Sequence, residues 1–315
     1  MKAFVSNRKS LAPRRFGSIL LASVLAGGLL AAVYGGTAGA DDYSAYSDPD
    51  KTALSVILSE RENVLELRQE FGLGNARVEK ILAAVREENR KLAEEYASSE
   101  KIVAANKTLP DEKVAAKISA SDYDETVEGA IEETKESVTG LLTEADEPEL
   151  RAWVDEQWAQ EVLSSSEENY ARMEETKAGR RLVCKVFATQ YIGYTRYEAS
   201  LPHRSLKFGS RPTVVIKRVN GNRVVRPRIK EVGPWNTYDN YWQPSRKRTM
   251  WKSLRRCTPQ AHAAYYRNYN RGKDEFGRTV LNPAGVDLTP AVARGLALGQ
   301  YENAWVYVKF PWLKR

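Results

Sequence analysis

LPHRSLKFGSRPTVVIKRVNGNRVVRPRIKEVGPWN, residues 201–236, is the stretch that decides the fold of the C-terminal part of the chain. It holds two runs rich in β-branched residues, 213–219 and 222–229, on either side of Asn220-Gly221. Asn-Gly is the dipeptide that most readily supplies the two positive φ values of a type I′ turn. The sequence therefore predicts a β-hairpin with a two-residue turn.

The second run of this hairpin has two different faces, because successive side chains of a strand point to opposite sides. One face carries Arg226, Arg228 and Lys230, and the other carries Val225, Ile229 and Glu231. Proline cannot donate a hydrogen bond to a neighbouring strand, so we expect the strand to end at Gly233-Pro234. Glu231 is then a carboxyl at the end of an apolar strand face.

Charge divides the chain into three parts, although the formal net charge of the whole chain is only +7. Residues 1–40 have five basic residues and no acidic ones, residues 41–180 have 17 basic and 34 acidic, and residues 181–315 have 26 basic and 7 acidic. Such a contrast indicates modules with different partners. We expect a signal peptide at 1–40, an acidic helical module at 41–180 and a basic domain at 181–315.

The first 40 residues have the pattern of an export signal. Basic residues precede an apolar run at 19–34, and Ala38-Gly39-Ala40 has the form of a cleavage site. The sequence thus predicts a secreted or cell-surface protein that begins near Asp41. An uncleaved membrane anchor is the alternative, but the run is short for a bilayer, and no stable membrane span is expected after cleavage.

Two cysteines, Cys184 and Cys257, both lie in the basic part. Export would permit a disulfide between them. The alternative is a pair of buried thiols, because separation in sequence does not determine distance in space.

The acidic middle of the chain has helical periodicity. Apolar residues recur at steps of three and four from Leu54 to Phe71 and again from Val78 to Leu92, and Leu109-Pro110-Asp111 interrupts the pattern. We expect an all-α helical bundle or short coiled coil. It would act as a spacer that holds the basic domain away from the cell envelope, or it would bind a protein partner.

Strand patterns return after residue 182, at 183–192, in the hairpin and at 304–310. One helix is marked by Thr289 as its N-cap and Pro290 at its first position. Short strands with one or two helices suggest a small closed β-barrel.

The order of five motifs in this part resembles the rare lipoprotein A family, which is related to expansins and to some lytic transglycosylases. The motifs are His203, the turn at 206–211, the Asn-Gly hairpin, Glu231-Val232-Gly233-Pro234 and Gly285-Val286-Asp287-Leu288-Thr289. The similarity covers residues 182–312. It implies an all-β, six-stranded double-psi β-barrel.

The resemblance also implies an active site. A histidine before the turn and an aspartate before Arg-Gly-Pro are the family's catalytic candidates, and a second aspartate precedes the last helix. His203 matches the first position and Asp287 the last, whereas Glu231 stands where the family has its middle aspartate.

Lytic cleavage of peptidoglycan needs one acid that protonates the glycosidic oxygen and, as a carboxylate, then takes a proton from the muramic C6 hydroxyl. Hydrolysis by an inverting or retaining mechanism instead requires two carboxyls at a set separation. We therefore expect Glu231 as acid and base, Asp287 as stabilising or orienting group and His203 as its hydrogen-bonding partner. The alternative is structural: the carboxylates cap turns and the histidine satisfies a backbone group.

Aromatic residues follow the hairpin. Their flat rings can stack on sugar rings while their polar edges form hydrogen bonds. We expect contacts to substrate from Trp235, Asn236, Tyr238, Tyr241 and Trp242. The same rings could instead cover an insertion with little core of its own. Aromatic and basic residues together favour peptidoglycan or another anionic cell-wall glycan, while nucleic acid fits the charge but not the export signal.

An expansin-like protein that binds wall polysaccharide without cleaving it is the alternative to the enzyme. Two histidines and two cysteines do not make a metal-ligand pattern of recognisable spacing, so we expect no metal and no cofactor.

Overall fold

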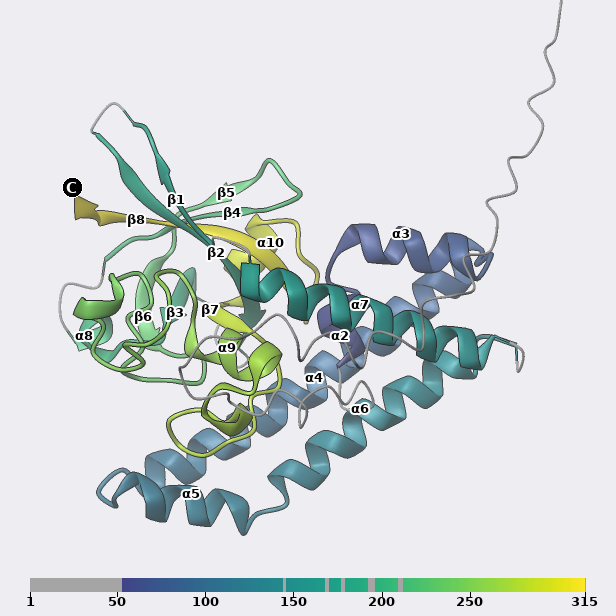
Figure 1. Cartoon of the computed structure of the whole chain (residues 1–315), viewed down its shortest axis with the longest axis horizontal. Coiled ribbons are helices and arrows are strands. Elements are labelled where there is room, and N and C mark those ends of the chain that lie inside the picture. Colours follow the sequence, from purple (N-terminus) through teal and green to yellow (C-terminus); the bar gives the residue numbers. More distant parts are fainter. Residues whose placement is uncertain are drawn as a thin grey trace, which may run out of the picture. The chain divides into compact units, whose positions relative to one another are not determined.

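A helical region precedes a strand-rich region in this computed structural model, which describes residues 53–143, 146–167, 170–176, 179–191, 196–208 and 212–314. Figure 1 shows the two regions in colours that follow the sequence. The expected export signal lies outside the described residues. Within them, no helix is both long enough and apolar enough to cross a bilayer.

The predicted helices are present before residue 168. They are α2 (Leu54–Ile57), α3 (Arg61–Glu70), α4 (Asn75–Ala105), α5 (Asp111–Ser119), α6 (Tyr123–Thr139) and α7 (Glu147–Glu167). The predicted break is confirmed, because α4 ends at Ala105 and α5 begins directly after Pro110. Helices α4 and α6 lie side by side (Figure 1).

Helix α4 is 31 residues long and has one buried face. Ile81, Val85 and Leu92 are buried at helical spacing, as the periodicity predicts, but so are the polar Glu88 and Asn89. Glu88 accepts a hydrogen bond from the backbone N–H of Ser55 at 3.0 Å, and burial raises the pKa of its carboxyl to about 7. A polar side chain is buried on α4 because other elements pack there.

The strand-rich region forms one mixed, curved half-barrel sheet. Its strands are β1 (Ala171–Glu174), β2 (Arg181–Gln190), β3 (Glu198–Leu201), β4 (Val215–Arg218), β5 (Val224–Val225), β6 (Arg228–Val232), β7 (Ala284–Leu288) and β8 (Ala304–Lys314). The order is β5-β4-β8-β2-β7-β3-β6, and β1 pairs with β2. The described residues thus form an eight-stranded sheet where the resemblance implies six strands. Strand β1 adds to the count because residues before the expected boundary at 181 join the sheet.

The predicted hairpin forms, but its turn is not type I′. Ile216 pairs with Val225 and Lys217 with Val224, which is the register of a two-residue turn. The φ of Gly221 is not in the left-handed range, however, and the ladder ends at Lys217. The backbone N–H of Val219 donates to the carbonyl of Trp305 on β8, so the chain leaves the hairpin to pair with β8.

The alternation predicted for the second run is confirmed as far as Ile229, whereas Lys230 and Glu231 are both half-buried. Val225 and Ile229 are buried, whereas Arg226 and Arg228 are exposed. Pro227 divides this run into β5 and β6, since it lacks a backbone N–H. Strand β6 ends directly before Gly233, as expected.

Short helices connect the strands: α8 (Arg204–Phe208), α9 (Gln260–Arg267), α10 (Pro290–Gly295) and the 3₁₀ turns η3 (Ser245–Lys247) and η4 (Tyr269–Gly272). The predicted cap of α10 is confirmed, with Thr289 in extended geometry and Pro290 at the first helical position. The two cysteines form a disulfide between β2 and the segment before α9. Their Cα atoms lie 5.2 Å apart.

Helices and sheet share one hydrophobic core. Val114, Tyr123 and Trp158 of the helices belong to the same buried cluster as Phe187 and Val306 of the sheet. The hydroxyl of Tyr123 donates to the carbonyl of Thr279 at 3.0 Å. The acidic helices therefore pack against the basic sheet.

Candidate functional site

Four polar residues lie at one level across four neighbouring strands. The register pairs Thr189 of β2 with Asp287 of β7, Asp287 with Ser200 of β3, and Ser200 with Glu231 of β6. The pairing of β3 with β6 shifts register between Ala199 and Ser200, directly beside this row. Such irregularities commonly adjoin active sites because they change the direction of a side chain.

All four residues of the row line a cavity of about 300 Å³. The sheet side also includes Gln190, Trp235 and Asn282. Helix α4 supplies the other side, with Asn89, Tyr96 and Glu100 among its lining residues. The cavity therefore lies between the two halves of the chain, and the volume is at the small end for ligand sites.

Asp287 has the properties of an acid that is protonated near neutral pH. Its side chain is buried, with 6% of the residue exposed, and the Thr189 hydroxyl donates a hydrogen bond to its Oδ1 atom. Burial raises the pKa of this carboxyl to about 7, which the hydrogen bond from Thr189 only partly offsets. The negative charge of Glu100 on α4 raises this pKa further.

Gly233 follows β6 and leaves space beside Asp287. Its φ is +136°, a conformation that residues with a side chain rarely adopt. A Cβ atom built at this position would lie 3.7 Å from Tyr96 Oη, 3.8 Å from Asp287 Oδ2 and 3.9 Å from Ser200 Oγ. Three polar side chains thus surround one small space at the edge of the cavity.

Trp235 lines the cavity but is itself buried, with 2% exposed. Its backbone N–H donates to Tyr96 Oη at 3.0 Å, and its indole N–H donates to Asn282 Oδ1 at 3.2 Å. The rings of Tyr96 and Trp235 meet edge to face, with centroids 4.8 Å apart. These contacts hold α4 against the loop that follows β6.

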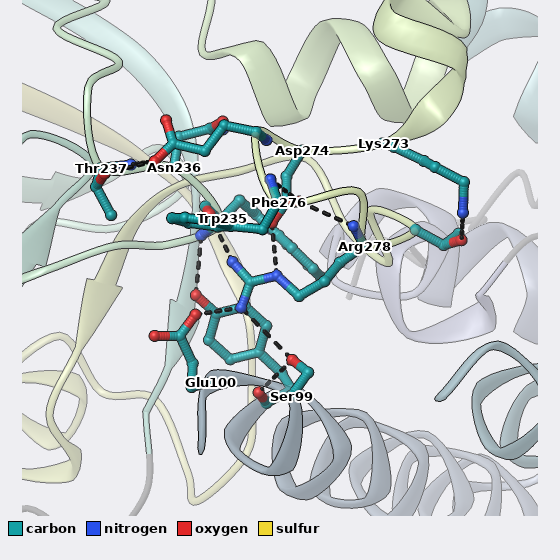
Figure 2. A network of polar contacts seen from close by, with 12 residues as sticks. Ser99, Glu100, Trp235, Asn236, Thr237, Lys273, Asp274, Phe276 and Arg278 are labelled. Atoms are coloured by element: carbon teal, nitrogen blue, oxygen red, sulfur yellow. Dashed lines mark hydrogen bonds and ion pairs between the residues drawn. The ribbon is translucent and has the colours of Figure 1, made fainter. Parts of the chain in front are cut away.

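Arg278 also stabilises the contact between α4 and the loop of Trp235. Figure 2 shows its guanidinium between α4 and the loops of the sheet region. It donates to Asp274 Oδ2 at 2.6 Å, to the carbonyl of Trp235 at 2.6 Å and to Glu100 of α4. The side chains of Arg278 and Asp274 are fully buried, whereas that of Glu100 is 44% exposed, so the charged network between the two halves reaches solvent at Glu100.

His203 does not join the carboxyls. Its ring nitrogens lie 2.7 Å from Ser205 Oγ and 3.1 Å from Thr249 Oγ1, and it is not among the cavity-lining residues. Partial burial lowers the pKa of this histidine, so the ring is neutral at pH 7. The structure thus brings Glu231 and Asp287 together and places His203 elsewhere.

Most of the expected sugar-binding residues lie in the interior. The hydroxyl of Tyr241 donates to the carbonyl of Gly285 at 3.0 Å, and Trp242 stacks on Phe310 with centroids 5.4 Å apart. Asn236 is also buried and donates to Gln260 Oε1 at 2.8 Å. Tyr238 is exposed and accepts a hydrogen bond from Arg204 at 2.7 Å.

Sequence reasoning missed every residue that α4 brings to the cavity. Tyr96 and Glu100 stand in a helix whose polar residues have the pattern of a solvated face. Tyr96 continues the apolar stripe four positions after Leu92, but periodicity alone does not show that a sheet covers it. Arg278 was missed as well, because a single arginine between glycine and threonine has no recognisable pattern.

No group of three or more histidine, cysteine or acidic side chains among the described residues could hold a metal ion. Thr189 and Asp287 contribute hydroxyl and carboxyl groups, and the α4 side contributes amide, phenol and carboxyl groups. This set is suited to hydrogen bonding and to proton transfer.

Comparison with known proteins gives one match. A family model described as a domain of unknown function (DUF8814) matches residues 172–309. No curated protein and no solved structure matches the chain. The matched residues contain the whole sheet side of the cavity and none of α4, so the similarity concerns the strand-rich region alone.

Proposed function

We propose that this cavity cleaves a cell-wall glycan, with peptidoglycan as the substrate, by a lytic transglycosylase-like reaction in an exported protein. The observation that carries the proposal is Asp287, a buried carboxyl with a pKa of about 7 that lines a cavity beside a second carboxyl. General acids at neutral pH need a pKa in this range. The role of acid and base, expected for Glu231, is better suited to Asp287.

In this reaction, the protonated Asp287 donates its proton to the glycosidic oxygen, and the bond from that oxygen to the anomeric carbon breaks. The resulting carboxylate then accepts the proton of the muramic C6 hydroxyl as its oxygen bonds to the anomeric carbon. The proton that leaves Asp287 is thus replaced, and no water is consumed. One carboxyl is sufficient for both steps.

Glu231 has the complementary role. It lies two strands from Asp287 at the same level, where a carboxylate stabilises the positive charge that develops on the sugar ring. His203 lies outside the cavity, so we assign it no part in the proton transfer. The hydroxyl of Thr189 holds Asp287 in place through Oδ1.

The resemblance to the rare lipoprotein A family supports a site that contains both carboxyls, although the family's catalytic candidates match His203 and Glu231 rather than Asp287. Its motifs place Glu231 and Asp287 in a common site, and both residues line the cavity. We propose that the core of the sheet is a double-psi β-barrel. The parallel pairs β2/β7 and β3/β6 are compatible with the crossed connections of such a barrel.

Binding without cleavage, as in expansins, is the alternative. One observation favours it: Arg226, between β5 and β6, and Arg228, at the start of β6, are exposed, and so is Tyr238. Such a surface would hold an anionic wall polymer. The buried positions of Tyr241 and Trp242 count against an extended aromatic platform.

Incubation of the full chain with purified sacculi tests the proposal. We expect soluble muropeptides with anhydro ends from the wild type and a loss of about 100-fold or more in rate for Asp287→Asn. Glu275→Gln is the matched control, because burial also raises the pKa of Glu275 to about 7 but Glu275 does not line the cavity. Sedimentation with sacculi without any soluble product would support the binding alternative instead.

A further inference from the structure

Tyr96 is a residue of the helical half that lines the cavity. Its oxygen accepts the backbone N–H of Trp235 at 3.0 Å. A phenol can accept and donate at the same time. No described residue accepts the hydroxyl proton of Tyr96, so this proton is available to a ligand.

Gly233 shows how close the Tyr96 hydroxyl and the Asp287 carboxyl lie, because a Cβ atom built there would contact both. The position of a missing Cβ there is 3.7 Å from Tyr96 Oη and 3.8 Å from Asp287 Oδ2. The Thr189 hydroxyl binds Asp287 through Oδ1, and no described residue donates to Oδ2. The hydroxyl proton of Tyr96 and Oδ2 of Asp287 therefore belong to residues that line one cavity from opposite halves of the chain, close to Gly233.

Tyr96 stays a donor across the useful pH range. Burial raises the pKa of its hydroxyl well above the ordinary value, and the negative charges of Glu100 and Asp287 act in the same direction. Arg278, whose guanidinium lies 4.7 Å from the centre of the ring, opposes this shift. The same arginine holds the loop of Trp235, so the ring and its hydrogen-bonding partner are positioned together.

We propose that Tyr96 donates a hydrogen bond to an oxygen of the sugar that lies between it and Asp287, so that α4 completes the substrate site of the sheet. This inference rests on the proposed function for the class of ligand. It adds a substrate-contacting residue that lies outside both the family match and the resemblance to the rare lipoprotein A family. The sheet region alone would then be an incomplete site.

The test compares Tyr96→Phe with Tyr123→Phe in the full chain. Tyr123 is the matched control because its hydroxyl also joins a helix to a loop of the sheet region, at 3.0 Å from the carbonyl of Thr279, yet it does not line the cavity. The probe is a trimer of N-acetylglucosamine, chosen because the cavity is small. Its affinity is measured by calorimetry, and sacculus cleavage is measured in parallel.

We expect Tyr96→Phe to weaken binding of the probe by about 5- to 10-fold, the effect of one lost hydrogen bond to a neutral group, and to lower kcat/KM at least as much. Tyr123→Phe should change both by less than about 2-fold. Near-ultraviolet circular dichroism of the two variants shows whether Trp235 keeps its surroundings. A Tyr96→Phe protein with an unchanged spectrum and weaker binding supports the inference.

The remaining outcomes separate this inference from the proposed function. If the wild type cleaves sacculi and the two variants have the same affinity for the trimer and the same kcat/KM, the role of Tyr96 is overturned and the proposed function is left intact. A wild type that binds the trimer in a Tyr96-dependent way but cleaves nothing overturns the cleavage and supports the site. A changed spectrum in Tyr96→Phe, or no binding and no cleavage by the wild type, overturns the inference.

Discussion

Asp287 and Glu231 both pair with Ser200, Asp287 from β7 and Glu231 from β6, so the two carboxyl residues lie at one level of the sheet with β3 between them. Neighbouring strands are about 4.8 Å apart, which separates the two Cα atoms by roughly 10 Å. Residues distant in sequence thus face one cavity. Asp287 is buried and Glu231 is half-buried, and the different roles proposed for the two carboxyls follow from this difference.

Cleavage should depend on the protonation of Asp287. Because its pKa is raised to about 7, the acid form is present below that pH and is lost above it. We expect kcat/KM of the full chain to fall as pH rises through about 7. A series of rate measurements across this range tests the expectation, and Glu275→Gln should keep the same profile.

The free energy of unfolding should also depend on the protonation of Asp287, and this contribution should fall as pH rises. The folded pKa is raised from its ordinary value near 4 to about 7, so the folded state holds a proton that the unfolded state releases between these two pH values. Stability from this group is therefore complete below about pH 4 and is lost as pH rises through about 7. Urea unfolding at about pH 5 and at about pH 8 should show a smaller difference for Asp287→Asn than for the wild type. An equal difference would contradict the burial of this group.

Arg278 should be among the most sensitive residues for stability. Replacing it by methionine leaves the buried Asp274 without its ion-pair partner and breaks the link to Glu100. We expect a loss of about 3–5 kcal/mol in the free energy of unfolding, measured by urea titration. The exposed Arg271, replaced in the same way, should change it by about 0.5 kcal/mol or less.

A double variant refines this prediction. Asp274→Asn added to Arg278→Met removes the uncompensated charge, so the double variant should be more stable than Arg278→Met alone. If Asp274→Asn lowers stability equally with and without Arg278, the two residues are not coupled.

The disulfide should contribute strongly because Cys184 and Cys257 are 73 residues apart in sequence. Closing a loop of this length stabilises a folded protein by about 4 kcal/mol, mainly by restricting the unfolded chain. Reduction, or replacement of both cysteines by serine, should lower the urea midpoint accordingly. A midpoint that does not respond to reductant would show that the bond is not formed in solution.

The elements that sequence predicted well are those with local causes. Pro110 before α5 and Thr289-Pro290 at α10 act through their own backbone, and the alternation of Val225 with Arg226 follows from strand geometry. The hairpin register was predicted for the same reason. Its turn type was not, because Val219 pairs with the distant Trp305.

The site was only partly predictable. Glu231 and Asp287 were found through the order of motifs, but their relative burial depends on strand neighbours such as Thr189 and on the helix that covers them. Tyr241 and Trp242 have the composition of a sugar-binding surface and instead fill the core, since composition does not distinguish these two uses of an aromatic ring. The contact of Tyr96 with Trp235 spans 139 residues, and no local pattern encodes it.

The most direct test of the account is the chemical form of the new glycan ends after digestion of sacculi by the full chain in isotope-labelled water. We predict ends one water molecule lighter than hydrolysed ends, without label from the solvent, formed by the wild type and by Glu275→Gln but not by Asp287→Asn. Labelled reducing ends, or products that persist in Asp287→Asn, would contradict it.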